Sequence, residues 1–196
     1  MLTIHLRDID KGVVEAWEQA FVDVPEIVVS HGDIFQQKAD AIVSPANSFG
    51  YMDGGIDLLY SRYFGWELET KLLALLFEQH YGELPVGQAV VLATGHDFIP
   101  FLVSAPTMRV PMSISETVNV YLAFRAALVA VLAHNARETT PIRSLLVPGL
   151  GTGIGQVTPA RAARQMRLAY DIIINGQGIK NRNARMVLKQ HHELLS

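Results

Sequence analysis

Short apolar runs rich in β-branched residues alternate along this chain with longer segments in which apolar residues recur every three to four positions. The first pattern is typical of buried strands and the second of helices that pack on one face. Strands are predicted at residues 2–7, 26–30, 39–44, 87–94, 101–105 and 143–147.

Helices are predicted between these strands, and several carry clear start signals. Asp10 can cap a helix that presents Val13, Val14, Trp17 and Phe21 on one face. Thr158, followed by proline, opens another helix that runs to about residue 175. Further helices are expected at 56–64, 66–81, 115–135 and 183–195. The alternation favours an α/β sandwich with a mixed, largely parallel central sheet.

Composition narrows the class of protein. A chain of 196 residues is expected to form a single domain over residues 1–196. Cysteine is absent, which excludes disulfides, thiolate metal sites and cysteine nucleophiles. The longest purely apolar run, residues 126–133, is far shorter than the roughly 20 residues of a membrane span. With no signal peptide visible in the first residues, we expect a cytoplasmic protein that does not contact a membrane.

Charge and motif searches exclude several kinds of site. The net charge is −3, which argues against broad binding to nucleic-acid phosphates. No His, Asp and Glu residues occur at metal-ligand spacing, so we expect neither a metal nor another cofactor, although Asp53 leaves room for a cation. The sequence also lacks the phosphate-binding signature of P-loop ATPases and the G-x-G-x-x-G fingerprint. The oligomeric state is left open.

Glycine clustering is the strongest local signal for a ligand. Two windows, residues 47–55 and 148–155, are glycine-rich, and each directly follows a predicted buried strand. Glycine lets backbone N–H groups approach a phosphate closely, and the second window leads into a helix N-terminus, which favours an anion. The two loops could hold a diphosphate between them. The alternative is that the glycines only make tight turns.

Four motifs in order resemble those of the macro domain family, an ADP-ribose-binding α/β/α module with hydrolytic members. They are Gly-Asp-Ile at 32–34, IVSPAN at 42–47, Gly-Gly-Ile-Asp at 54–57 and PGLGTGIG at 148–155. The resemblance extends over roughly residues 26–177. It implies a three-layer α/β/α sandwich in which the two glycine-rich loops face each other across one crevice.

The resemblance also implies roles for individual residues. Asp33 would accept a hydrogen bond from the adenine amino group, and the Ile34 amide would help to fix the ring. Ser44 stands where the family usually has asparagine, in the segment that contacts the ligand. Asn47 would touch the distal ribose, and Asp57 would orient or activate water near the anomeric carbon. The diphosphate would be lined by Gly54, Gly55 and Ile56 on one side and by Gly151, Thr152, Gly153, Ile154 and Gly155 on the other.

Each polar role has a plain structural alternative, because Asp33 and Asn47 could be turn residues and Asp57 could cap a helix. Three functions therefore stay open. The chain could hydrolyse mono-ADP-ribosyl groups or O-acetyl-ADP-ribose, it could bind ADP-ribose without turnover, or it could be an α/β module for another nucleotide.

Overall fold

The computed structural model describes residues 2–177 and 183–196. Its centre is a six-stranded sheet with the order β2-β1-β6-β3-β5-β4. All neighbouring strands are parallel except β4, which runs antiparallel to β5. This confirms the mixed, largely parallel sheet that the sequence predicts. The strands are β1 Thr3–Asp8, β2 Ile27–His31, β3 Ala41–Ser44, β4 Val90–Ala93, β5 Phe101–Ser104 and β6 Ser144–Val147.

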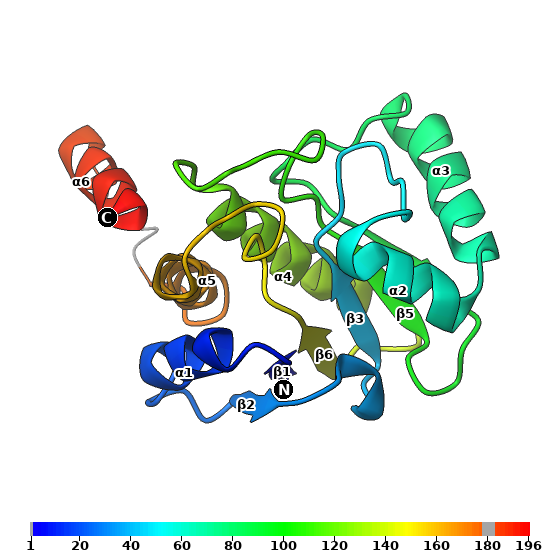
Figure 1. The fold of residues 1–196 in the computed structure, drawn as a ribbon, viewed down its shortest axis with the longest axis horizontal. Helices are drawn as coiled ribbons and strands as arrows, with labels where there is room; N and C mark the ends of the chain where they lie inside the picture. The colour runs from blue at the N-terminus through cyan, green and yellow to red at the C-terminus, as the bar shows by residue number, and fades with distance from the viewer. Residues whose placement is uncertain (1, 178–182) are drawn as a thin grey trace.

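Helices cover both faces of the sheet, as Figure 1 shows. They are α1 Lys11–Ala20, α2 Gly55–Phe64, α3 Glu67–His80, α4 Asn119–Arg137, α5 Pro159–Ile173 and α6 Ala184–Leu195, with a short 3-10 turn, η1, at Ile34–Gln36.

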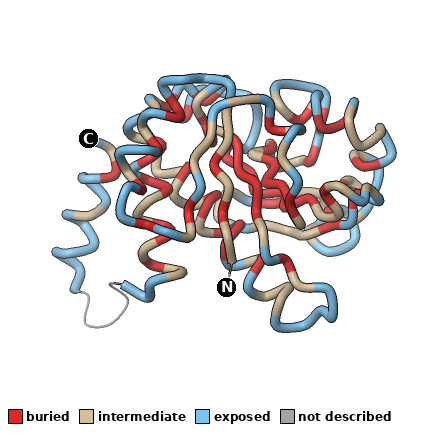
Figure 2. The backbone as a smooth tube through the Cα atoms, turned by 90° about the horizontal axis from the view of Figure 1, so that it is seen from below, coloured by how far each residue is buried: buried red, intermediate tan, exposed pale blue. Residues whose placement is uncertain are grey.

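Alternation along the central strands divides the core into two halves. Ala41 and Val43 of β3 pack in a cluster with α1, α4 and α5, whereas Ile42 between them packs in a second cluster with α2 and α3. Successive side chains of a strand point to opposite faces, so one buried strand supplies both clusters. Figure 2 shows the buried residues gathered along the sheet and on the helix sides that face it. The three-layer α/β/α architecture is therefore confirmed.

Three helices begin at a capping residue, and two of these caps, Asp10 and Thr158, are predicted from the sequence. Asp10 accepts hydrogen bonds from the backbone N–H groups of the first turn of α1, and Thr158 and Asn183 do the same for α5 and α6. The helix predicted from residue 115 is the exception, because α4 begins only at Asn119. Residues 115–118 are held in a turn instead, since the N–H of Ile114 donates to the carbonyl of Gly155 at 2.8 Å and that of Thr117 donates back to Ile114.

Helices α4 and α6 both pack against α5. By length and composition alone α4 could cross a membrane, but its buried residues pack against the sheet and α5. The C-terminal end of α6 is fixed to α5, since Gln165 donates to the carbonyl of Leu194 at 3.0 Å and Arg164 to that of Ser196 at 2.7 Å.

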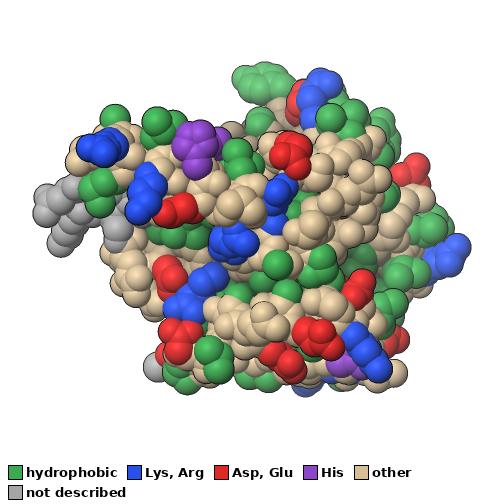
Figure 3. Space-filling model, turned by 60° about the vertical axis from the view of Figure 1, so that its left-hand side comes forward, with side chains coloured by type: hydrophobic (Ala, Val, Ile, Leu, Met, Phe, Trp, Pro, Cys, Tyr) green, Lys and Arg blue, Asp and Glu red, His purple; other side chains and the backbone are tan. Residues whose placement is uncertain are grey.

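Acidic and basic side chains are interspersed over the face formed by α1, α5 and α6 rather than forming one continuous basic surface (Figure 3).

Candidate functional site

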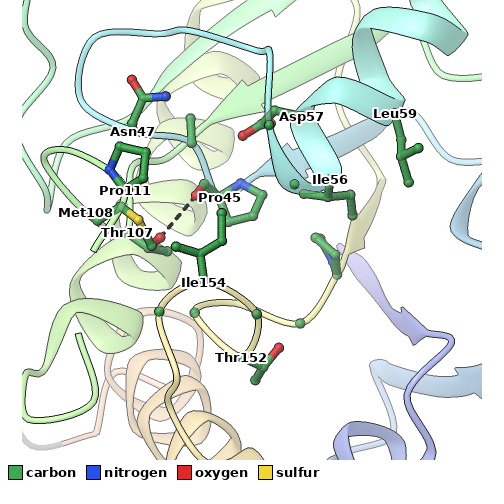
Figure 4. A pocket seen from close by; sticks show the side chains of 18 of the residues that line it. Pro45, Asn47, Ile56, Asp57, Leu59, Thr107, Met108, Pro111, Thr152 and Ile154 are labelled. Carbon is green, nitrogen blue, oxygen red and sulfur yellow. Dashed lines mark hydrogen bonds between the residues drawn. The ribbon is translucent and has the colours of Figure 1, made fainter. Parts of the chain in front are cut away.

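A cavity of about 390 Å³ opens at the carboxyl ends of the strands. Its walls come from the connections that follow β1, β3, β5 and β6 and from the beginning of α2 (Figure 4). In open α/β sheets this edge is where ligands bind. The cavity is lined by Asp8, Ile9, Asp10, Pro45, Ala46, Asn47, Tyr51, Asp53, Gly54, Gly55, Ile56, Asp57, Leu59, Thr107, Met108, Pro111, Pro148, Gly149, Gly151, Thr152, Gly153, Ile154 and Gly155.

The connection from β3 to α2 forms one wall and is tied to the connection from β5 to α4. The hydroxyl of Thr107 donates to the carbonyl of Pro45 at 3.0 Å, the bond drawn in Figure 4. The N–H of Ser48 donates to the carbonyl of Met108 at 3.1 Å. These bonds hold two segments far apart in sequence against each other, so this wall of the cavity is formed before any ligand binds.

Asn47 lies on this wall, and its side chain is used within its own turn. Its amide nitrogen donates to the carbonyl of Tyr51 at 2.8 Å, and its amide oxygen accepts from the N–H of Phe49 at 3.0 Å. Asn47 and Asp57 lie apart in Figure 4, and no hydrogen bond between described residues joins them. The turn role considered for Asn47 is therefore realised, while the residue still lines the cavity.

Asp57 lies in the first turn of α2 and is only 7% exposed. The hydroxyl of Ser44 donates to its Oδ1 at 2.5 Å. Burial raises the pKa of Asp57 to about 7, although the hydrogen bond from Ser44 acts in the opposite direction by favouring the charged form. The expectation that Asp57 could cap the helix is wrong. The capping position belongs to Gly54, and the carboxylate bonds Ser44 rather than a helix N–H.

The next turn of α2 anchors the helix that carries Asp57, both to β3 and to the loop before the helix. The hydroxyl of Tyr60 donates to the carbonyl of Val43 at 3.0 Å, and the hydroxyl of Ser61 donates to that of Met52 at 2.8 Å. Burial, together with the nearby charges of Asp57 and Asp8, raises the pKa of Tyr60 well above its usual value. Tyr60 is therefore a neutral donor at any physiological pH.

The connection from β6 to α5 forms the opposite wall. Its first glycine is held by Asp8, whose Oδ2 accepts from the N–H of Gly149 at 2.9 Å. Gly155 allows the loop to close on itself, because a Cβ there would lie 2.5 Å from the carbonyl oxygen of Gly151. Ile154 lies between the two loops in Figure 4, and a Cβ on Gly55 would lie 3.8 Å from its Cδ1. The two glycine-rich loops thus face each other across one cavity.

Backbone N–H groups are available on both of these walls. Within the described residues, no hydrogen bond uses the N–H groups of residues 151–155, and the first turn of α2 has no side-chain cap. The N-terminal N–H groups of a helix lack intrahelical partners and carry a partial positive charge. Among the residues that the structure describes, by contrast, the lining includes four aspartates and no Lys, Arg or His. An anion in this cavity would therefore be held by backbone amides rather than by cationic side chains.

Most of the residues expected at the site line the cavity, namely Asn47, Gly54, Gly55, Ile56, Asp57, Gly151, Thr152, Gly153, Ile154 and Gly155. Three do not. Ser44 is fully buried behind Asp57, and Ile34 is buried in the α2–α3 cluster. Asp33 is exposed and caps η1, accepting from the N–H of Phe35 at 3.0 Å.

Comparison with known proteins agrees with this geometry. Residues 43–166 match the family model of the macro domain. The chain belongs to the macro domain family. A protein of Aquifex aeolicus is 35% identical over 141 residues, covering 72% of this chain and 78% of the relative, and one of Aeropyrum pernix is 33% identical over 147 residues, covering 75% and 71%.

Solved macrodomains share the fold of this one. The macrodomain of Mycobacterium tuberculosis DarG superposes with a TM-score of 0.60 at 23% identity, covering 72% of this chain and 88% of its own. The Oceanobacillus iheyensis macrodomain with ADP gives 0.57 at 20% identity, covering 70% and 72%.

Part of the cavity of this macro domain comes from outside the matched residues. Asp8 ends β1, Ile9 and Asp10 follow it, and the sequence does not predict any of the three at the site. Asp8 is also bonded to the second loop, and Ile9 is 74% exposed at the cavity edge. The available signal was two carboxylates directly after a predicted strand. Using it would have required knowing that β1 lies beside β6, which no local pattern reveals.

Proposed function

We propose that this macro domain binds ADP-ribose and hydrolyses mono-ADP-ribosyl groups or O-acetyl-ADP-ribose. The observation that carries the binding proposal concerns residues 2–177 and 183–196. There, the two facing loops have backbone N–H groups that no hydrogen bond uses, and no cationic side chain lines the cavity. A diphosphate fits such a site because its charge is spread over oxygens that amides can reach from two sides. That a related fold from O. iheyensis was solved with ADP supports the same ligand class.

The cavity has Asp57 and Asn47 on one side and Ile9 on another, and this difference indicates how ADP-ribose would lie in it. With the diphosphate between Gly54–Gly55 and Gly151–Gly155, the distal ribose would lie toward Asp57 and Asn47. The adenosine would extend toward Ile9. Asp33 follows β2, the strand beside β1, and His31 of that strand contacts the carbonyl of Ile9 at 3.0 Å. A base that extends past Ile9 would then come within reach of the Asp33 carboxylate.

Hydrolysis would use Asp57 as the general base. Its Oδ2 takes a proton from a water molecule as the water oxygen bonds to the anomeric carbon of the distal ribose. The bond from that carbon to the acceptor breaks, its electron pair stays on the acceptor, and the acceptor takes up a proton from solvent. With O-acetyl-ADP-ribose the water oxygen bonds to the acetyl carbonyl carbon instead. The bond from that carbon to the ribose oxygen breaks, the ribose oxygen keeps the electron pair and takes up a proton, and acetate leaves. A carboxyl whose pKa is about 7 suits this role, since a base works best near the operating pH.

The second candidate is a binding module without turnover. The internal bonding of Asn47 favours it, because the amide is already engaged by Tyr51 and Phe49 and has less capacity left to orient water. Both candidates predict tight ADP-ribose binding, and only the first predicts product release.

Calorimetric titration with ADP-ribose, with AMP and NAD as controls, tests binding. Release of ADP-ribose from modified proteins and of acetate from O-acetyl-ADP-ribose tests turnover. We expect Asp57→Asn to lower turnover by about 10²–10⁴-fold while the ADP-ribose Kd stays within three-fold. Asp53→Asn, which removes an exposed carboxylate from the same cavity wall, is the matched control and should keep its turnover. If the parent protein binds ADP-ribose but releases nothing from any linkage, the function that remains is that of a binding module without turnover.

A further inference from the structure

Ser44 is the buried partner of Asp57, and the sheet holds it rigidly. It is the last residue of β3, is fully buried, and lies in register with Ser104 of β5. Its carbonyl accepts from the N–H of Ala105 at 2.9 Å, and Pro45 follows it. From this position its hydroxyl donates to the Oδ1 of Asp57.

The two oxygens of Asp57 have different surroundings. Oδ1 accepts the 2.5 Å hydrogen bond from Ser44, whereas no hydrogen bond within the described residues reaches Oδ2. In that part of the chain, the one fully buried side-chain polar atom without a partner is Oγ of Ser104. Oδ2 therefore reaches solvent, and Asp57 lines the cavity.

We propose that Ser44 is a positioning residue for Asp57. By holding Oδ1, its hydroxyl turns Oδ2 toward the cavity, and it supplies a hydrogen bond that favours the charged form of the buried carboxylate. The role in turnover rests on the proposed function, whereas the effect on the carboxylate does not.

The N-terminus of α2, whose first turn holds Asp57, favours the charged carboxylate in the parent and in Ser44 variants alike, so it does not replace a lost Ser44 hydroxyl. Among the described residues, the other titratable side chains that line the cavity are acids or a phenol, as is the buried Tyr60 of α2, so none of them favours a second negative charge. These groups are Asp8, Asp10, Tyr51, Asp53 and Tyr60. The cation of α2, Arg62, is exposed in its last turn. The second glycine-rich loop contributes no titratable side chain. Loss of the Ser44 hydroxyl would therefore go uncompensated.

A purely structural role for Ser44, as a brace between β3 and α2, can be separated from this one. The bond from Tyr60 to Val43 anchors α2 to the same strand without involving Ser44. Ser104 is the matched control, because it is equally buried at the facing position of the neighbouring strand and its hydroxyl has no partner to lose.

The first experiment follows the titration of the Asp57 carboxyl by ¹³C NMR in the parent, Ser44→Ala and Ser104→Ala. A hydrogen bond to a charged group is strong enough that its loss should move the midpoint upward by roughly one pH unit or more. We expect that shift in Ser44→Ala and none in Ser104→Ala. Ser44→Cys, which keeps a weaker donor, should shift less than Ser44→Ala and serves if Ser44→Ala does not fold. An unmoved midpoint in Ser44→Ala, or equal shifts in both alanine variants, overturns the proposal.

The second experiment measures turnover against pH. If the midpoint moves by one unit, the ionised fraction of Asp57 at pH 7 falls about five-fold. We therefore expect kcat of Ser44→Ala to fall by at least that factor at pH 7 and to recover toward pH 9, with KM and the ADP-ribose Kd within two-fold. Ser44→Thr, which keeps the hydroxyl, should show the same dependence of kcat on pH as the parent. A loss that is equal at every pH contradicts the proposal. If the parent shows no turnover, the hydrolase function fails, and the NMR titration still decides the role of Ser44.

Discussion

The side-chain amide of Asn47 donates a 2.8 Å hydrogen bond to the carbonyl of Tyr51, which closes the turn between them. Tyr51 is 54% exposed and lines the cavity, so this bond sets the shape of the wall that a ligand would meet. An amide that braces a loop and borders a site affects binding and turnover together. Asp57 of α2, in contrast, is bonded to Ser44 of β3 and does not brace this loop.

Replacing Asn47 should therefore loosen the wall. We expect Asn47→Ala to speed amide hydrogen exchange over residues 47–54 and to weaken ADP-ribose binding by about ten-fold, because both hydrogen bonds that brace this wall are lost. Asn47→Asp keeps the acceptor for Phe49 but loses the donor to Tyr51, so its effect should be intermediate. Unchanged exchange in Asn47→Ala would show that the turn holds without the amide.

The burial of Asp57 predicts a pH dependence of stability. Its pKa is raised from 3.8 to about 7 in the folded protein, so folding favours the protonated form. The resulting stability is complete below pH 3.8 and is lost as the pH rises through 7. Asp57→Asn cannot ionise, and at pH 9 it should be more stable than the parent by up to about 4 kcal/mol, with the gain fading toward pH 4. Urea unfolding at pH 4, 7 and 9 measures this. A parent that gains stability relative to Asp57→Asn with rising pH would contradict it.

Two glycines of the second loop should respond differently to alanine. A Cβ on Gly155 would clash with Gly151 and Ile114, whereas a Cβ on Gly153 meets no atom within 4 Å. We expect Gly155→Ala to cost about 1–3 kcal/mol of stability. Gly153→Ala should keep the parental Tm but weaken ADP-ribose binding, because the new methyl group lies on the cavity wall. Thermal melts and calorimetry on the same samples separate the effects. Parental affinity in Gly153→Ala would place the diphosphate away from this loop.

Asp33 combines a capping role with a predicted role in reading adenine, and two variants distinguish them. Asp33→Asn keeps an oxygen for the N–H of Phe35 and removes the charge. If the carboxylate accepts from the adenine amino group, Asp33→Asn should weaken ADP-ribose binding about ten-fold with no change in Tm. Asp33→Ala should weaken binding and also lose the cap. If Asp33→Asn binds as tightly as the parent, the residue is a cap alone.

Local sequence signals predict much of this fold because they act over a few residues. Asp10 and Thr158 each cap the helix that their position predicts, since a cap needs only the next three residues. The start of α4 differs from the start that the sequence predicts, because it depends on a contact between distant residues. Residues 115–118 have helix-compatible side chains, but Ile114 is bonded to Gly155, 41 positions away, and this tertiary contact delays the helix to Asn119.

The same distinction applies to the site. The two glycine-rich loops were visible in the sequence because each follows its own strand. The contribution of Asp8 and Ile9 was not, since it depends on β1 lying beside β6. The contact of Ser44 with Asp57 was hidden for a similar reason. It needs α2 to fold back over the end of β3, a placement set by Tyr60 and the α2–α3 cluster rather than by spacing along the chain.

The position of β6 determines when this cavity can exist during synthesis. β1 and β2 form one pair of strands, and β3, β4 and β5 form another group, but only β6 pairs with both β1 and β3. Until residues 144–147 have left the ribosome, none of the strand pairings that join β1 and β2 to β3, β4 and β5 can form, so the cavity walls on the two sides have no sheet to fix them to each other. The second glycine-rich loop follows β6 directly, so the strand that joins the two groups of strands also delivers the last wall of the cavity. A nascent chain stalled before that point would carry Asp57 and Ser44 but have no enclosed site in which to use them.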